Sequence, residues 1–101
     1  MIVNNITINI EKQLEQEWLA WITKDIIPQV LDSALIKGHS RLKLLNEVEG
    51  QGVTYSFQFH YNNLEDYQAS NPSPAIFLYQ LHYELYKDRF VLFETLLQRQ
   101  L

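Results

Sequence analysis

The 101-residue sequence contains no cysteine and few chain-breaking residues, with three glycines and three prolines. The absence of cysteine excludes disulfide bonds, thiolate metal ligands and a cysteine nucleophile. No apolar run approaches the roughly 20 residues that a membrane-spanning helix requires. The first residues alternate like a strand and lack the basic start and apolar core of a signal peptide. We therefore expect a cytoplasmic protein with no membrane partner.

Positive charge is also scarce. Eight basic residues stand against twelve acidic ones, which gives a formal net charge of −4, and the basic residues do not cluster. A phosphate-binding surface needs a coherent positive stripe, so we expect no nucleic-acid partner. The length and the 47% hydrophobic content predict one globular domain that covers residues 1–101.

One stretch, residues 53–61, alternates cleanly between apolar and polar side chains. Strict alternation predicts a β-strand, because successive side chains point to opposite faces of a sheet. The apolar face consists largely of aromatic rings, which must be buried. The other face carries only neutral hydrogen-bonding groups, namely Thr54, Ser56, Gln58 and His60. Residues 2–10 repeat this pattern, with Asn5, Thr7 and Asn9 on the polar side.

The intervening segments predict helices. Apolar residues recur at helical spacing after Glu11, and Pro28 interrupts them. Asp25 is a candidate cap for a second helix that runs to about Leu35, and Gly38 is suited to end it. The remaining predictions are a strand over 39–49, a turn over 49–52 and a short helix over 64–70, for which Asn62 and Asn63 offer a cap. A helix over 74–87 capped by Ser73 and a strand over 90–97 follow.

The resulting order is β-α-β-β-α-β. It predicts an α+β, ferredoxin-like sandwich, in which a four-stranded antiparallel sheet carries both helices on one face. In this arrangement the strands over residues 2–10 and 53–61 are the central pair. The charges that flank the strand over 39–49 favour an edge position, where charge discourages aggregation between sheets.

Four segments resemble a known family over nearly the whole chain: IVNNITINI, EQEWLAWITKDIIPQVL, RLKLLNE with GVTYSFQF, and FVLFETLL. This family consists of short bacterial proteins that are classed only as a domain of unknown function. The resemblance implies the dimeric α/β-barrel variant of the ferredoxin-like fold. Its motifs are structural, so it implies no activity.

The polar sheet face is the main candidate site. The exposed face of a monomeric sheet usually carries charged residues, whereas neutral amides and hydroxyls suit a partly dehydrated surface. We therefore expect a homodimer joined through this face. Trp18 and Trp21 could frame an aromatic pocket, although tryptophan at helical spacing is more typical of core packing. The candidate ligand-binding residues are Asn5, Thr7, Ser56, Gln58, His60 and Trp21.

The three histidines, His39, His60 and His82, fall on different predicted elements without metal-ligand spacing. We expect no metal site and no cofactor. His60 is the one candidate catalytic residue, because it ends the polar row. His82 is expected on the surface of its helix or at the edge of the core.

Three functions are compatible with the sequence, which leaves open whether the protein is an enzyme. The first is a homodimer without established catalytic activity that binds at most a small ligand. The second is a small cofactor-independent oxygenase or isomerase that acts on a hydrophobic or aromatic molecule between sheet and helices, with His60 transferring a proton. The third is a protein-interaction module that uses an exposed stripe of Tyr79, Tyr83 and Tyr86.

Overall fold

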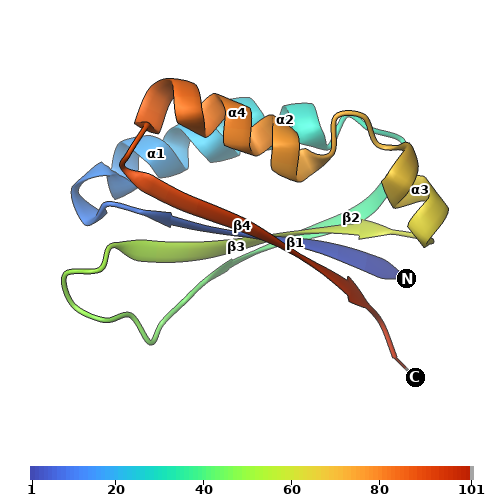
Figure 1. The fold of residues 1–101 in the computed structure, drawn as a ribbon, viewed down its shortest axis with the longest axis horizontal. Coiled ribbons are helices and arrows are strands. Elements are labelled where there is room, and N and C mark those ends of the chain that lie inside the picture. Colours follow the sequence, from blue (N-terminus) through green and yellow to red (C-terminus); the bar gives the residue numbers. More distant parts are fainter. Residues whose placement is uncertain (101) are drawn as a thin grey trace.

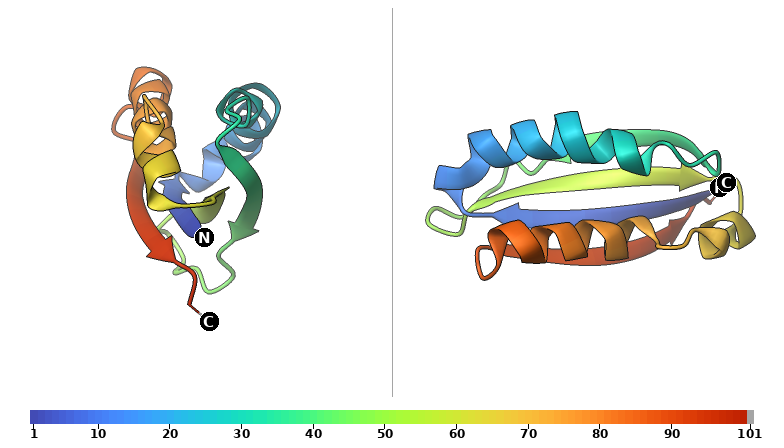
Figure 2. Two further views of the ribbon diagram at one scale, coloured as in Figure 1. Left: turned by 90° about the vertical axis from the view of Figure 1, so that its right-hand side faces the viewer. Right: turned by 90° about the horizontal axis from the view of Figure 1, so that it is seen from above.

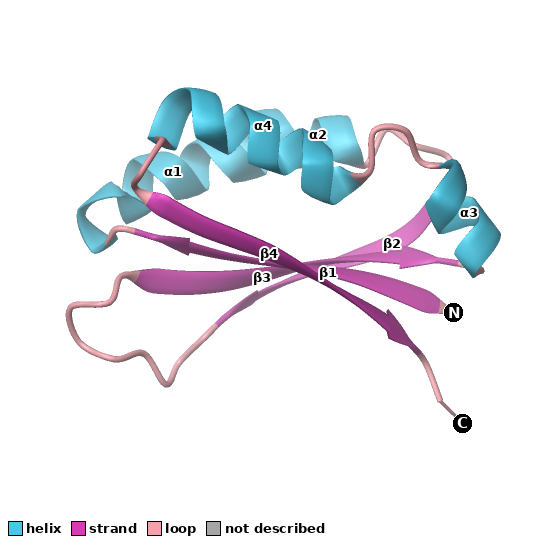
Figure 3. Ribbon diagram, viewed as in Figure 1, coloured by secondary structure: helices cyan, strands magenta, loops and turns pink. Residues whose placement is uncertain are grey.

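The computed structural model describes residues 1–100. Its four strands form one antiparallel sheet in the order β2-β3-β1-β4, and the helices cover one face of that sheet (Figures 1 and 3). This is the predicted ferredoxin-like arrangement. The strands are β1 (Ile2–Ile10), β2 (Ile36–Lys43), β3 (Val53–Tyr61) and β4 (Phe90–Gln98).

The central position of β1 and β3 is confirmed. Each is paired on both sides, and along each strand buried and half-buried residues alternate without a break. The buried side faces the helices and forms the core. The largest fully buried side chains include Ile6, Trp18, Phe57, Phe59, Tyr61 and Leu78.

The first helical arm is irregular. A 3₁₀ turn (Lys12–Leu14) precedes α1 (Glu15–Trp21), and a π-helical segment (Ile22–Ile26) leads into α2 (Ile27–Val30). The interruption expected at Pro28 is present, but the predicted cap is wrong. Asp25 lies within the π-helical segment, and no side chain caps α2. The wide π turn precedes Pro28, which lacks the N–H that a regular helix would use at that position.

The next strand differs most from its prediction. β2 begins at Ile36 and ends at Lys43, whereas the sequence indicated residues 39–49. Gly38 lies inside β2, opposite His60, and therefore does not end a helix. The predicted edge position and the antiparallel hairpin with β3 are confirmed. Gly52 has a φ of +79°, and a Cβ there would lie 2.6 Å from the carbonyl oxygen of Ile10, so glycine is required.

The second helical arm agrees closely with its prediction. It consists of α3 (Leu64–Ala69) and α4 (Pro74–Tyr86). The Asn63 side chain accepts a hydrogen bond from the Asp66 amide at 2.8 Å, and Ser73 accepts one from the Ile76 amide at 3.3 Å. Figure 2 shows the two arms side by side above the sheet, with α1 and α2 in one and α4 in the other. No helix described over residues 1–100 combines the length and hydropathy that crossing a bilayer requires.

Candidate functional site

The polar residues of β1 and β3 lie together on the face of the sheet that the helices leave uncovered, which we call the open face. The register pairs Asn5 with Gln58 and Thr7 with Ser56. Directly opposed residues of antiparallel strands share a face, so these four form a contiguous patch. The Asn5 Oδ1 accepts hydrogen bonds from Ser56 Oγ and from Gln58 Nε2, the latter at 3.4 Å. The predicted polar patch is therefore confirmed as a hydrogen-bonded unit.

The two edge strands add apolar side chains to the open face. On β2, Leu42 lies opposite Ser56 and is 53% exposed. On β4, Phe93 lies opposite Thr7 and is 55% exposed. Val91 and Leu97 lie on the same face of β4 as Phe93, and they are 59% and 44% exposed. The open face thus has a neutral polar centre with exposed apolar residues on both sides.

The charged residues of the strands that have a register partner are found on the other side of the sheet; Lys37 of β2 lies at the bulge between Ile36 and Gly38 and has no such partner. Arg41 and Lys43 of β2 lie opposite Phe57 and Tyr55, and Glu94 of β4 lies opposite Ile6. Since those partners face the helices, the charges do so as well. The open-face positions of the four strands carry no Asp, Glu, Lys or Arg: Val3, Asn5, Thr7, Asn9, Gly38, Ser40, Leu42, Thr54, Ser56, Gln58, His60, Val91, Phe93, Thr95 and Leu97.

His60 and Trp21 do not join in one site. His60 lies at the end of the open face, opposite Val3 and close to Gly38. Trp21 lies in the helical layer, where its ring packs edge-on against His82 at 5.1 Å and against Tyr86 at 5.5 Å. A substrate held between sheet and helices would not contact His60. The strand register places His60 on the face away from the helices, so it contradicts the hypothesis that His60 transfers a proton in a pocket between sheet and helices.

His82 is fully buried, so its predicted position on the helix surface or at the edge of the core is wrong. The indole nitrogen of Trp18 donates a hydrogen bond to His82 Nε2 at 2.9 Å, and His82 Nδ1 lies 2.6 Å from the carbonyl oxygen of Leu78. Because an indole N–H can only donate, Nε2 accepts and the proton resides on Nδ1. His82 is thus a neutral residue with a hydrogen bond at each ring nitrogen, and it connects α1 with α4. Desolvation by burial lowers the pKa of His82.

The lowered pKa of His82 predicts acid sensitivity. Between the unfolded pKa of about 6.5 and the lower native pKa, the unfolded chain binds a proton that the native protein does not. The free energy of unfolding should therefore fall as the pH drops below about 6.5, by up to about 1.4 kcal/mol per pH unit. Urea titrations between neutral pH and the onset of carboxylate protonation would measure this loss at constant protein concentration.

Two variants separate His82 from the other acid-sensitive groups. His82→Gln should remove the pH dependence in this window, whereas His39→Gln, at an exposed position, should retain it. Hydrogen bonds from Arg89 and from Lys43 lower the pKa values of Glu11 and Glu15, so their contributions are lost only below about pH 4.5. An unchanged slope in His82→Gln would contradict the assignment.

The tyrosine stripe is divided by the fold. Tyr79 and Tyr83 are each 48% exposed, and their rings stack with centroids 6.3 Å apart. Tyr86, in contrast, is buried beside Trp21, and burial raises the pKa of its hydroxyl. The predicted three-residue patch is therefore reduced to a pair.

A buried asparagine escaped the sequence-based prediction. Asn4 lies on the helix-facing side of β1 and is fully buried. Its Nδ2 donates to Glu94 Oε2 at 2.7 Å, and the Tyr67 hydroxyl donates to the same oxygen at 2.8 Å. Burial, followed by the bond to Glu94, raises the pKa of Tyr67 to about 12. The sequence does contain a signal for this buried position, because Asn4 is the one polar residue at an inward position between Ile2 and Ile6.

Asn4 is expected to reduce stability, because its Oδ1 has no hydrogen-bond partner among residues 1–100. An unsatisfied buried acceptor costs roughly 1–3 kcal/mol, which outweighs one hydrogen bond to an exposed carboxylate. Asn4→Leu should therefore raise the free energy of unfolding by about 1 kcal/mol in urea titrations. Asn5→Leu, on the open face, is the matched control and should not reproduce that gain. A loss of stability in Asn4→Leu would indicate that Oδ1 is satisfied by water.

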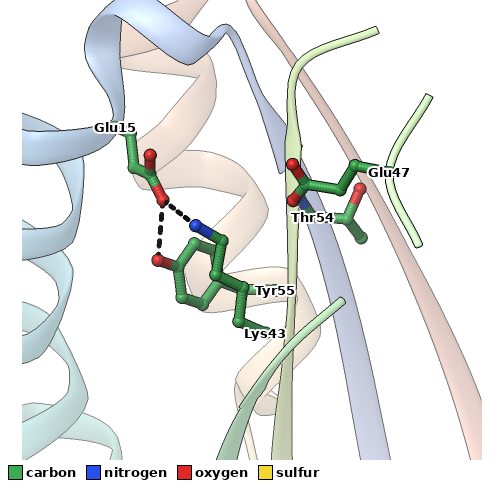
Figure 4. A network of polar contacts seen from close by, with 5 residues as sticks. All are labelled: Glu15, Lys43, Glu47, Thr54 and Tyr55. Carbon is green, nitrogen blue, oxygen red and sulfur yellow. Dashed lines mark hydrogen bonds and ion pairs between the residues drawn. The ribbon is translucent and has the colours of Figure 1, made fainter. Parts of the chain in front are cut away.

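Edge strand β2 is tied to α1 by one carboxylate. Glu15 Oε2 accepts from Lys43 Nζ at 2.9 Å and from the Tyr55 hydroxyl at 2.8 Å (Figure 4). Burial, followed by this bond, raises the pKa of Tyr55. Exposed ion pairs of this kind contribute little stability, so we assign the cluster to positioning of the edge strand. Within residues 1–100, no group of three His, Asp or Glu side chains is arranged to hold a metal ion.

Comparisons with known proteins identify a family and several similar structures. A family described as "Domain of unknown function (DUF4286)" matches residues 1–100. An ethyl tert-butyl ether D (EthD) family protein from Bacillus halodurans has a similar structure, with a TM-score of 0.69 and 10% identity over 99% of this chain and 100% of that one. Hydroxynitrile lyase from Passiflora edulis is also similar, with a TM-score of 0.58 and 18% identity over 99% of this chain and 96% of that one.

A more distant match is a dimeric ferredoxin-like protein from an uncultured marine organism, with a TM-score of 0.49 and 8% identity over 99% of this chain and 97% of that one. No curated protein sequence matches the chain. At 10% and 18% identity, the EthD family protein and the hydroxynitrile lyase support the fold alone and carry no activity over to this chain.

Proposed function

We propose a function for this chain from its own surface, because the chain belongs to the DUF4286 family, whose function is unknown. The protein is a cytoplasmic homodimer that assembles through the open face. One observation carries this proposal. The positions that the strand register assigns to the open face include no charged side chain, and they leave Leu42, Val91, Phe93 and Leu97 exposed.

The open face has the composition of an interface rather than of a solvated surface. Buried interface centres are depleted of charge and enriched in aromatic residues, and Phe93 lies opposite Thr7 near the middle of β1. The neutral groups of Asn5, Ser56 and Gln58 already bond to one another, so covering them leaves few unsatisfied polar atoms. Desolvating this surface therefore costs little.

A twofold axis suits this face. In a symmetric dimer the same patch meets itself, so every apolar residue contributes twice. The polar centre of one sheet would face the polar centre of the other, with the apolar edges on either side. His60 and Gly38, at one end of the face, would line the same interface.

Light scattering coupled to size exclusion tests the assembly. The expected mass is twice the 12.0 kDa of one chain at micromolar concentration. A mass of one chain across the micromolar range would overturn the proposal. A variant that removes the dimer without unfolding the protein completes the test and is described in the Discussion.

A further inference from the structure

A pocket of about 610 Å³ lies on the helix side of the sheet, away from the open face. Its volume falls within the range of small-molecule sites. The end of α2 and the loop after it form one wall, and the segment between α3 and α4 forms the other. None of the six residues singled out from the sequence lines it. The lining residues are Pro28, Gln29, Val30, Asp32, Ser33, Ile36, Tyr61, Ser70, Asn71, Pro72, Pro74 and Phe77.

The pocket has flat apolar walls and a buried tyrosine in its lining. Three prolines and Phe77 supply the walls. Tyr61, at the end of β3, is fully buried, and its hydroxyl accepts a hydrogen bond from Ser70 Oγ at 3.2 Å. The Tyr67 ring packs edge-on against Tyr61 at 5.5 Å and fixes its orientation. Flat walls with a few convergent polar atoms suit a ring-bearing ligand.

The charge of the lining decides which ligands fit. Asp32 is the one carboxylic acid in it and is exposed at the rim, and its carboxylate has no hydrogen-bond or ion-pair partner among residues 1–100. No lysine, arginine or histidine lines the pocket. Gln29 uses its amide nitrogen on the Asp25 carbonyl, which leaves its side-chain oxygen as an acceptor. The lining therefore favours hydrogen-bond donors and positive charge, and it disfavours anions.

We propose that this pocket binds a small ring-bearing amine in its protonated form. The ring lies between Phe77 and the prolines, and the ammonium group lies at the rim beside Asp32. Burial raises the pKa of Tyr61, so its hydroxyl stays protonated at neutral pH and remains a hydrogen-bonding group. This site is independent of the proposed dimer, because its residues lie on the opposite side of the sheet.

Three probes with the same ring and different charge test the site. Phenethylamine is cationic, phenethyl alcohol is neutral and hydrocinnamate is anionic. Amide NMR titrations of the full chain should show phenethylamine binding about tenfold more tightly than hydrocinnamate, with the alcohol between them. The shifts should centre on Ser33, Ser70 and Asn71. Failure of all three probes to bind, or shifts centred elsewhere, would overturn the site.

A charge-matched pair of variants tests the role of Asp32. Asp32→Asn should remove the advantage of the amine over the alcohol while leaving binding of the alcohol unchanged. Asp88→Asn, at the exposed turn before β4, alters the net charge equally and should preserve the order of the probes. Equal binding of the three probes in the wild type, or the same loss in both variants, would refute selection of an amine by this pocket. Neither result bears on the mass measured by light scattering.

Discussion

Trp18→Ala should lower the free energy of unfolding by about 3–5 kcal/mol, which is a large share of the roughly 5–15 kcal/mol typical of a domain. Trp18 is fully buried, and its ring lies 5.3 Å from Tyr55 and 6.1 Å from Phe57. Truncation would leave a cavity between α1 and β3. It would also leave the Nε2 of His82 without its donor.

Two further variants divide this loss into its parts. Trp18→Phe retains most of the buried ring but not the hydrogen bond, so it should cost about 1–3 kcal/mol. Trp21→Ala, one turn further along the same arm, is the matched control and should cost clearly less, because Trp21 is only half-buried. Urea titrations at neutral pH measure all three. Equal losses for Trp18→Ala and Trp21→Ala would contradict the assignment of Trp18 to the centre of the core.

Phe93→Asp should convert the proposed dimer into a monomer, with the dissociation constant raised more than about 100-fold. The side chain projects from β4 onto the open face. In a twofold assembly each substitution occurs twice, and each would place an unpaired carboxylate in the interface. Burial of such a charge costs several kcal/mol, well above the roughly 2.7 kcal/mol that corresponds to 100-fold.

Phe93 is also a safe position to test, because it is 55% exposed in the single chain and its replacement should leave the core intact. Leu85→Asp is the matched control: Leu85 is 60% exposed, but it lies on α4, away from the open face. Light scattering should give half the mass for Phe93→Asp and the full dimer mass for Leu85→Asp. A dimer in both variants would show that another surface joins the chains.

The sequence alone determined the strand faces and the element order. The alternation in β1 and β3 assigned Asn5, Thr7, Ser56 and Gln58 to one face, because a period of two leaves no other arrangement. The caps Asn63 and Ser73 were predictable as well, since their hydrogen bonds are made within three residues. The family resemblance implied the same ferredoxin-like fold and identified no functional site.

Tertiary structure decided what local patterns cannot contain. Six of the nine residues of β4 are apolar and they occupy both faces, so only its register with β1 shows that Phe93 faces outward. His82 and Asn4 are buried because partners distant in sequence, Trp18 and Glu94, meet them there. The pocket on the helix side of the sheet likewise joins residues from α2, β3 and the segment before α4. The alternating strand Val53–Tyr61 thus predicts an uncharged face, and only the packed sheet shows the exposed apolar residues on either side of it, on which the proposed dimer rests.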